Sequence, residues 1–499
     1  MSDSLLVVIA GLGLPGLLPA LAVARRSPAL VFVAPLIGAG LAAIAAGLEL
    51  AVGGSLLPWY AGVAITVNVA TLIFWLVARR SARLQALKGT GSAAGSSLTW
   101  SMLTVVVVLG AMVAPLTGLR AGITGYDTTA IWLTHALMVA GGHHVLLSGL
   151  QNPVYLSSNP DYPPLVPAAG ALAFALAGQG HLHVAVGVTV LLSACALGVG
   201  GVGVAAIGIG GRPVTRVVAL AAGAAQCLAG FAVAGIYGID GHADLLWSAA
   251  AAAAIVWGLV LPQSTQALGL AWVCAAVAGL TKNEGLTTAL VVLVLIAIRY
   301  RPLTLPRLRR TGLRASQGSL SMLAWPGLRL WAERAAFVAV PALPGLAWAG
   351  LARHIGLHDA FFRSRSTQSV PYRAAATMSS MAAHLTIAPL AIAVLVAGCC
   401  LVRHDRDGGR LGNPAWLWAA GLLATAILFA TYVFGSPEIH WWLHTSVLRT
   451  TIFPQLLLYT DVAAWLVIAF GALTGPVPIP PGGAWHVTDA APVTARAGG

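Results

Sequence analysis

The chain of 499 residues has only 14 acidic residues, and several of them stand in short polar clusters at the ends of long apolar runs. A carboxylate in such a place could act as a general base, and an arginine or lysine could hold an anion such as phosphate. Ionisable groups beside apolar segments are costly to place and are usually functional. Five of these clusters carry the candidates for chemistry.

The first cluster is Gly125-Tyr126-Asp127, and the apolar pair Ile131-Trp132 follows it. The carboxylate of Asp127 could deprotonate an acceptor hydroxyl as a general base. Asp is also a favourable N-cap residue, and an apolar segment begins just after this position. The residue types leave the catalytic and the capping role equally open.

The second cluster, residues 159–165, reads Asn-Pro-Asp-Tyr-Pro-Pro-Leu. Proline is tolerated in the first turn of a helix, where no backbone donor is lost, so this stretch predicts an extended entry into a helix. This structural role is enough to explain the prolines. Asp161 and Tyr162 could in addition face a site.

The third cluster, residues 238–244, places Asp240 and Asp244 on either side of His242. Carboxylate oxygens and an imidazole could together bind a divalent cation. The alternative is a loop turn followed by a helix cap, in which the same residues have only a structural role. A divalent cation is therefore one hypothesis for this segment.

The fourth cluster contains Lys282 and Glu284, between two apolar runs of about 15 residues each. At about 1.5 Å per residue, such runs barely cross a hydrocarbon core of ~30 Å, so both side chains are expected within the membrane-embedded body. They could form a pair that neutralises itself. Alternatively, Lys282 could face an anionic headgroup.

The fifth cluster, residues 438–449, combines two tryptophans with His440, His444 and Arg449. Tryptophan is often an interfacial anchor, but anchoring does not require the histidines and the arginine. A further basic group, Arg353, Arg363, Arg365 and Arg373, precedes it. The planar fork of arginine suits phosphate, although a solvated loop would have the same composition.

The composition indicates the kind of structure in which these clusters lie. Hydrophobic residues make up 58% of the chain and charged residues 8%, whereas soluble domains have about 25% charged residues. The net charge of +13 comes from short basic groups between apolar runs, which is typical of cytoplasmic loops and argues against nucleic-acid binding. Five cysteines without metal-ligand spacing are expected to be small buried side chains. Frequent Ala, Gly and Arg are typical of a GC-rich bacterial genome.

The apolar runs predict an all-α, polytopic transmembrane bundle of about 11–14 spans, with its N-terminus outside. We divide it into N-terminal helices at 1–97, a catalytic module at 98–474 and a disordered tail at 475–499. Residues 118–163 are expected outside, as a large loop with short interfacial helices. Counting spans forward from the N-terminus puts residues 118–163 outside, whereas counting backward from the basic group at 299–314 puts them inside. One run between 118 and 216 is therefore miscounted, either the short run 164–178 or an interfacial helix near 128–147.

The succession of polar motifs resembles the GT-C superfamily of membrane glycosyltransferases, of the protein mannosyltransferase and aminoarabinose transferase type. The matching motifs are Tyr126-Asp127 with Trp132, the segment 159–165, Gly-His-Ala-Asp-Leu at 241–245, Gly-Leu-Thr-Lys-Asn-Glu-Gly at 279–285 and Trp-Leu-His-Thr-Ser-x-x-Arg at 442–449. They extend over about residues 98 to 460. The sequence departs from the family pattern in having three spans before Asp127 and no second acidic residue beside it.

This resemblance implies an inverting transfer of a sugar from a polyprenyl phosphate to an acceptor hydroxyl, at the outer face of the inner (plasma) membrane. Asp127 would be the catalytic base, and Lys282, Arg363, Arg365 and Arg449 would hold the donor phosphate. Tyr162, Asp240, Asp244, Glu284, His440 and His444 would orient the substrates, with a divalent cation as a possible cofactor. The acceptor would be an envelope glycan, lipid or protein. The alternatives are a transporter or lipid flippase, and a non-catalytic scaffold.

Overall fold

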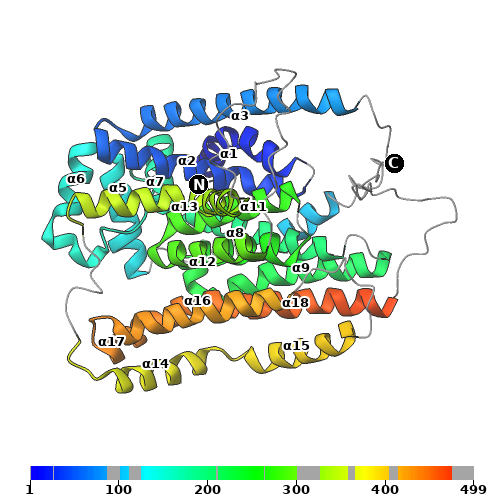
Figure 1. Cartoon of the computed structure of the whole chain (residues 1–499). Coiled ribbons are helices and arrows are strands. Elements are labelled where there is room, and N and C mark those ends of the chain that lie inside the picture. The colour runs from blue at the N-terminus through cyan, green and yellow to red at the C-terminus, as the bar shows by residue number, and fades with distance from the viewer. Residues whose placement is uncertain are drawn as a thin grey trace.

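The computed structural model describes residues 2–25, 27–86, 102–111, 125–208, 212–262, 264–299, 326–357, 366–403 and 414–474 (Figure 1). Every regular element among these residues is a helix, which confirms the predicted all-α bundle. Parts of the basic loops and the tail at 475–499 lie outside the described residues, so the predicted disorder of the tail stays a prediction.

The helices follow the apolar runs of the sequence. Their bounds are α1 Ser2–Ala24, α2 Leu30–Val52, α3 Leu56–Ala86, η2 Thr128–Leu133, α5 Thr134–Ala140, α6 His143–Gln151, η3 Pro153–Ser158, α7 Leu165–Ala177, α8 Leu182–Ile207, α9 Pro213–Ala234, η4 Gly235–Gly238, α10 Asp244–Ile255, η5 Val256–Val260, α11 Thr265–Thr281, α12 Asn283–Arg299, α13 Pro326–His354, α14 Val370–His384, α15 Ala388–Arg403, α16 Ala415–Phe434, α17 Ile439–Thr450 and α18 Ile452–Thr474. A further helix comprises Met102–Ala111.

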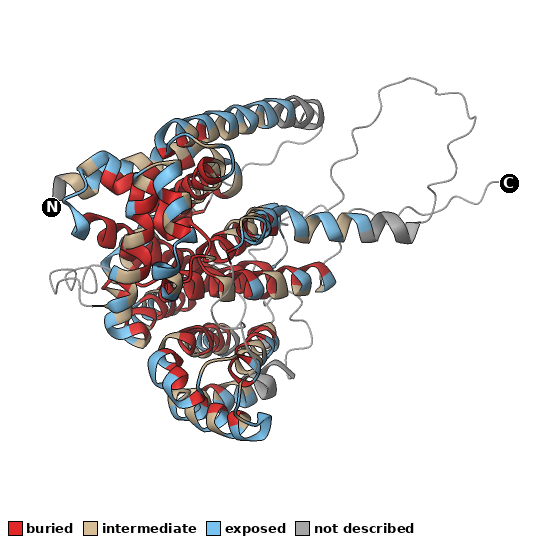
Figure 2. Cartoon of the chain, turned by 90° about the vertical axis from the view of Figure 1, so that its left-hand side faces the viewer, coloured by how far each residue is buried: buried red, intermediate tan, exposed pale blue. Residues whose placement is uncertain are grey.

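Eight helices among the described residues are long and apolar enough to cross a membrane, or nine if the bent pair α14–α15 is one span. Large apolar side chains point outward from the bundle, among them Leu14, Phe74 and Leu422, each more than 60% exposed. Figure 2 shows the buried residues gathered in the interior helices and the exposed ones on the peripheral helices. Exposed apolar surface of this extent is expected in lipid, so this is a multi-pass membrane protein.

The count of 11–14 spans depends on the shorter apolar helices. α11 has 17 residues, and α10 continues without a break into η5. At about 1.5 Å per residue, 17 residues rise about 25 Å, slightly less than a hydrocarbon core of ~30 Å. The count therefore stays a prediction, while the multi-pass architecture does not depend on it.

Glycines let the N-terminal helices approach each other closely. A Cβ on Gly16 of α1 would lie 2.0 Å from the Ala34 carbonyl oxygen, and one on Gly38 of α2 would lie 1.9 Å from the Leu12 carbonyl oxygen. Only a hydrogen atom fits at either position. Small residues at helix contacts are the usual way to pack helices in lipid, where the hydrophobic effect does not drive association. This pair packs in turn against α7 and α8.

α7 has 13 residues, which rise only about 20 Å. It starts three residues after Tyr162, which lines a cavity at one end of the bundle. α8 starts five residues after α7 ends. Near the start of α8, Val186 lies beside Gly241 and Thr128, at the same end of the bundle. Because the chain enters α7 and begins α8 at that same end, α7 does not carry the chain across the bundle. The apolar run 164–178 is thus the miscounted one, and residues 125–163 and the start of α8 lie on one side.

The remaining helices place Arg212 and Arg299 at the end of the bundle opposite the cavity. α12 starts beside Lys282 and ends at Arg299, whereas α9 starts after Arg212 and leads through η4 to Asp240. We call the end of the bundle with Lys282 and Asp240 the site end, and the end with Arg212 and Arg299 the basic end. In Figure 1, α5, α6 and α17 lie at the site end, on the left, and the C-terminal ends of α3 and α18 lie at the basic end, on the right.

Candidate functional site

At the site end of the described part of the chain, a cavity of about 970 Å³ opens, which we call the main cavity. Its walls come from segments far apart in the sequence: the start of η2, the loop before α7, the turn before α10, the junction of α11 and α12, and helices α16 and α17. The candidate residues that line it are Asp127, Tyr162, Asp240, Lys282, Glu284, His444 and Arg449. Four of the five polar clusters, and part of the fifth, therefore meet in one place.

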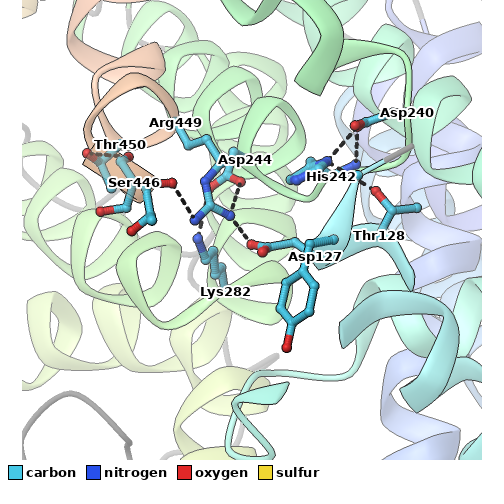
Figure 3. Close-up of polar contacts among 12 residues, drawn as sticks. Asp127, Thr128, Asp240, His242, Asp244, Lys282, Ser446, Arg449 and Thr450 are labelled. Atoms are coloured by element: carbon cyan, nitrogen blue, oxygen red, sulfur yellow. Dashed lines mark hydrogen bonds and ion pairs between the residues drawn. The ribbon is translucent and has the colours of Figure 1, made fainter. Parts of the chain in front are cut away.

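Asp127 and Arg449, which are 322 positions apart, form an ion pair between Oδ2 and Nη1 (Figure 3). Asp127 is 21% exposed and Arg449 14% exposed, so both side chains stay accessible from the cavity. The Asp127 side chain makes no capping hydrogen bond to the helix that follows it. Of the two roles that the sequence left open, the structure therefore does not support the N-cap.

Asp244 and Lys282 form a second, deeper pair. Lys282 Nζ lies 2.8 Å from Asp244 Oδ1 and 3.4 Å from Glu284 Oε1. The Asp244 side chain is 1% exposed, and its other oxygen, Oδ2, lies 4.0 Å from Arg449 Nη1. Asp244 is thus the central anion between the two cations. The local Lys282–Glu284 pair exists, but the closer partner of Lys282 lies on another helix.

Tyr162 forms the wall behind Lys282. Its ring stacks on Trp132 at a centroid distance of 5.6 Å, and Lys282 Nζ lies 5.4 Å from its centroid. Burial and the nearby Glu284 carboxylate raise the pKa of Tyr162 well above its ordinary value, so its hydroxyl stays protonated. The neighbouring Asp161 accepts a hydrogen bond from Asn283 Nδ2 at 2.6 Å, which ties this loop to α12.

Asp240 and His242 form a third buried pair, with 2.5 Å between Asp240 Oδ1 and His242 Nδ1. The Oγ1 of Thr128 lies 3.1 Å from the same nitrogen. Asp244 is bonded to Lys282 instead, so the three residues of this segment do not converge. Within the described residues, no group of three His, Cys, Asp or Glu side chains could hold a metal ion. The divalent cation stays a prediction.

The wall of the cavity on α16 and α17 mixes apolar and polar side chains, and its α16 part was missed in the sequence. It includes Ile427, Leu428, Trp441 and Trp442. In the same wall, the Tyr432 hydroxyl bonds Ser446 Oγ at 2.7 Å and Thr450 Oγ1 at 2.8 Å. The spacing of Ser446 and Thr450, one helical turn apart and ending beside Arg449, is the signal that could have found this face.

Two predicted histidines have different surroundings. His444 lines the main cavity, whereas His440 bonds the Tyr372 hydroxyl at 2.6 Å and lines a shallow groove between α14 and α17. His444 and Trp441 border both spaces. His440 is therefore outside the main cavity, and its predicted role in orienting the substrates has no support from its position.

The predicted basic group before α15 is described only in part. Arg363 and Arg365 lie outside the described residues. Arg373 is 1% exposed and donates to the backbone oxygens of Val433, Tyr432 and Pro437. Its guanidinium fastens α14 to the C-terminal end of α16, which has unpaired carbonyls to satisfy. The expectation that Arg373 binds an external anion is wrong, because its donors are used within the protein.

Comparisons with known proteins leave this geometry as the main source of functional evidence. No protein-family model, no curated protein and no solved structure matches the chain.

Proposed function

We propose that the chain is an integral membrane glycosyltransferase that moves a sugar from a polyprenyl-phosphate donor to an acceptor hydroxyl. The observation that supports this most is the convergence of Asp127, Lys282 and Arg449 on one large cavity at the site end. Transfer from a lipid phosphate needs a base for the acceptor and cations for the leaving phosphate. These three residues supply both.

The chemistry follows from the ion pairs. A donor phosphate that binds between Arg449 and Lys282 competes with Asp127 for the guanidinium, and this frees the carboxylate. The Asp127 oxygen then takes the proton of the acceptor hydroxyl while that hydroxyl attacks the anomeric carbon. The bond from the anomeric carbon to the phosphate oxygen breaks, and the phosphate leaves as an anion held by the two cations. A single displacement of this kind inverts the anomeric carbon.

The apolar part of the cavity suits the lipid tail of the donor. α16 contributes Ile427 and Leu428 to the cavity, while neighbouring positions such as Leu422 face outward from the bundle. A prenyl chain could therefore lie along α16 with its phosphate beside Arg449. The basic residues at the other end of the bundle favour a cytoplasmic location of that end under the positive-inside rule, which supports transfer at the outer face.

The test uses purified protein in lipid nanodiscs with a panel of polyprenyl-phosphate-linked hexoses and pentoses. Release of polyprenyl phosphate together with a glycosylated product is the expected result. Asp127→Asn should lower the rate by about 10²–10⁴-fold, because the amide cannot accept the proton. The unfolding temperature of the Asp127→Asn variant should stay close to that of the unchanged protein. Glu333→Gln, which removes a carboxylate from α13 at the basic end, is the matched control and should transfer normally.

The transporter or flippase alternative gives a different result. Substrate movement across proteoliposomes with no chemical change, unaffected by Asp127→Asn, would overturn the glycosyltransferase proposal. Full transfer activity in Asp127→Asn would leave the enzyme class in place and remove Asp127 from the role of base.

A further inference from the structure

The buried Asp240–His242 pair is not used in the proposed transfer step. His242 is 4% exposed and Asp240 3% exposed, and both line the cavity that holds Asp127. Figure 3 shows the imidazole between Asp240 and Thr128, on the far side of Asp127 from Lys282. A buried imidazole beside a carboxylate is costly unless its polar atoms have partners. Its two nitrogens therefore need to be considered separately.

The Nδ1 atom of His242 has its partner inside the protein. A carboxylate only accepts hydrogen bonds, so the short contact with Asp240 Oδ1 places a proton on Nδ1. Thr128 Oγ1 lies 3.1 Å from the same atom. The bond at one nitrogen of histidine sets the state of the other, which leaves Nε2 as the nitrogen able to bond a ligand in the cavity that His242 lines. Among the described residues, no hydrogen bond to Nε2 is present.

The pair also packs against the backbone that leads to Asp127. A Cβ on Gly125 would lie 2.5 Å from His242 Cε1 and 2.6 Å from Asp240 Oδ2. A methyl group there would displace both side chains, and the contact brings the imidazole within two residues of the proposed base. A turn that merely joined η4 to α10 would not need an imidazole pressed against this segment.

We propose that the Asp240–His242 pair is a hydroxyl-binding subsite, in which His242 Nε2 hydrogen-bonds a hydroxyl group of a sugar in the cavity. This rests on the proposed glycosyl transfer and names the part of the substrate that the pair recognises. A hydroxyl both donates and accepts, so it fits Nε2 whether or not that atom carries a proton. The two cations hold the phosphate, and the imidazole holds the sugar. The hydroxyl belongs either to the donor sugar or to the acceptor.

Binding measurements with two probes, made without any acceptor, separate recognition of the phosphate from recognition of the sugar. The probes are a polyprenyl-phosphate-linked sugar that the unchanged protein transfers, and polyprenyl phosphate alone. His242→Ala should weaken binding of the sugar-linked probe by roughly 5–10-fold, the effect of one hydrogen bond, and leave polyprenyl phosphate unchanged. Gly125→Ala, which displaces the pair without removing it, should act in the same direction. His183→Ala, an exposed histidine at the start of α8, is the control and should bind both probes normally.

The outcomes distinguish the two sources of the hydroxyl. Weaker binding of the sugar-linked probe assigns the hydroxyl to the donor. Unchanged donor binding with a raised KM for the acceptor in transfer assays assigns it to the acceptor. If His242→Ala and Gly125→Ala alter neither, with stable folded protein, the subsite is overturned and glycosyl transfer stands. If the unchanged protein transfers no sugar, the proposed function fails first.

Discussion

At the scale of single residues, the site is a balance of buried charges rather than a set of free catalytic groups. Two cations, Lys282 and Arg449, face three carboxylates, and Asp244 is the most buried of them. A charge in such a place is tolerated only with its partner, because desolvation costs several kcal/mol per ion. The ion pairs therefore hold the side chains of the site in place, and under the proposed function the donor phosphate would exchange with them.

Asp244→Ala should show the structural part of this balance. The change leaves Lys282 buried with only the more distant Glu284, and should lower the free energy of unfolding by about 3 kcal/mol. The double variant Asp244→Leu with Lys282→Met removes both charges and should recover at least half of that loss. Thermal unfolding in mild detergent measures both. Equal losses in the single and double variants would contradict a buried pair between these residues.

Glu438 provides a pH dependence at the site end. Its carboxylate accepts hydrogen bonds from Trp441 N at 2.6 Å and His440 N at 3.0 Å, at the start of α17. These bonds and one from Gln368 lower the pKa of Glu438 from 4.5 to about 2. Because the pKa is lower in the folded state, the ionised carboxylate stabilises the fold above about pH 4.5. That contribution is lost as the pH falls from there toward 2.

The comparison of the unchanged protein with Glu438→Gln tests this. The amide accepts more weakly than a carboxylate, so the variant should unfold at a lower temperature at neutral pH. The difference should be constant down to about pH 5 and shrink below it, since acid protonates only the unchanged residue. A difference of the same size at pH 3 and pH 7 would show that the charge of Glu438 does not stabilise α17.

At the scale of elements, small residues set how closely the helices pack. Gly38 and Gly40 lie on the same helix, two positions apart, and have opposite surroundings. A Cβ on Gly38 would meet the backbone of Leu12, whereas a Cβ on Gly40 would have nothing within 4 Å. Sequence alone cannot separate them, because both belong to one apolar run with many small residues.

Gly38→Ala should therefore destabilise the protein, and Gly40→Ala should not. The first change forces α1 and α2 apart and should cost about 1–3 kcal/mol, the usual range for overpacking. The second only improves helix propensity, by up to about 1 kcal/mol. Thermal unfolding of the two variants side by side is the measurement. A lower unfolding temperature for Gly40→Ala than for Gly38→Ala would contradict the close contact.

The positions of most helices could be predicted from the sequence, but the partners of their polar side chains could be predicted only in part. Apolar periodicity located most helices, because each run must fill a helix in lipid. The partners of Lys282 were only half predictable: Glu284 is two positions away, whereas Asp244 is 38 positions away and meets it only through the packing of α10 on α11. His440 and His444 stand one helical turn apart, yet only the structure shows that His444 lines the main cavity and His440 does not.

At the scale of the whole molecule, the reversal at α7 decides which side the site faces. Composition could not detect it, because α7 is as apolar as a crossing helix and differs only in length. With α7 returning to the site end, α8 and α9 carry the chain to Arg212 at the basic end and back to Asp240. The forward count from the N-terminus and the backward count from 299–314 then agree.

This topology predicts opposite accessibility for two exposed residues. Ser148 lies on α6 at the site end, and Thr265 starts α11 at the basic end. In a cysteine-free background, Ser148→Cys should react with a membrane-impermeant maleimide in intact cells. Thr265→Cys should react only after permeabilisation. The reason is that the basic loops stay in the cytoplasm. The reverse pattern would put the cavity in the cytoplasm and contradict transfer at the outer face, while equal labelling of Thr265→Cys in intact and permeabilised cells would contradict the crossing of α11.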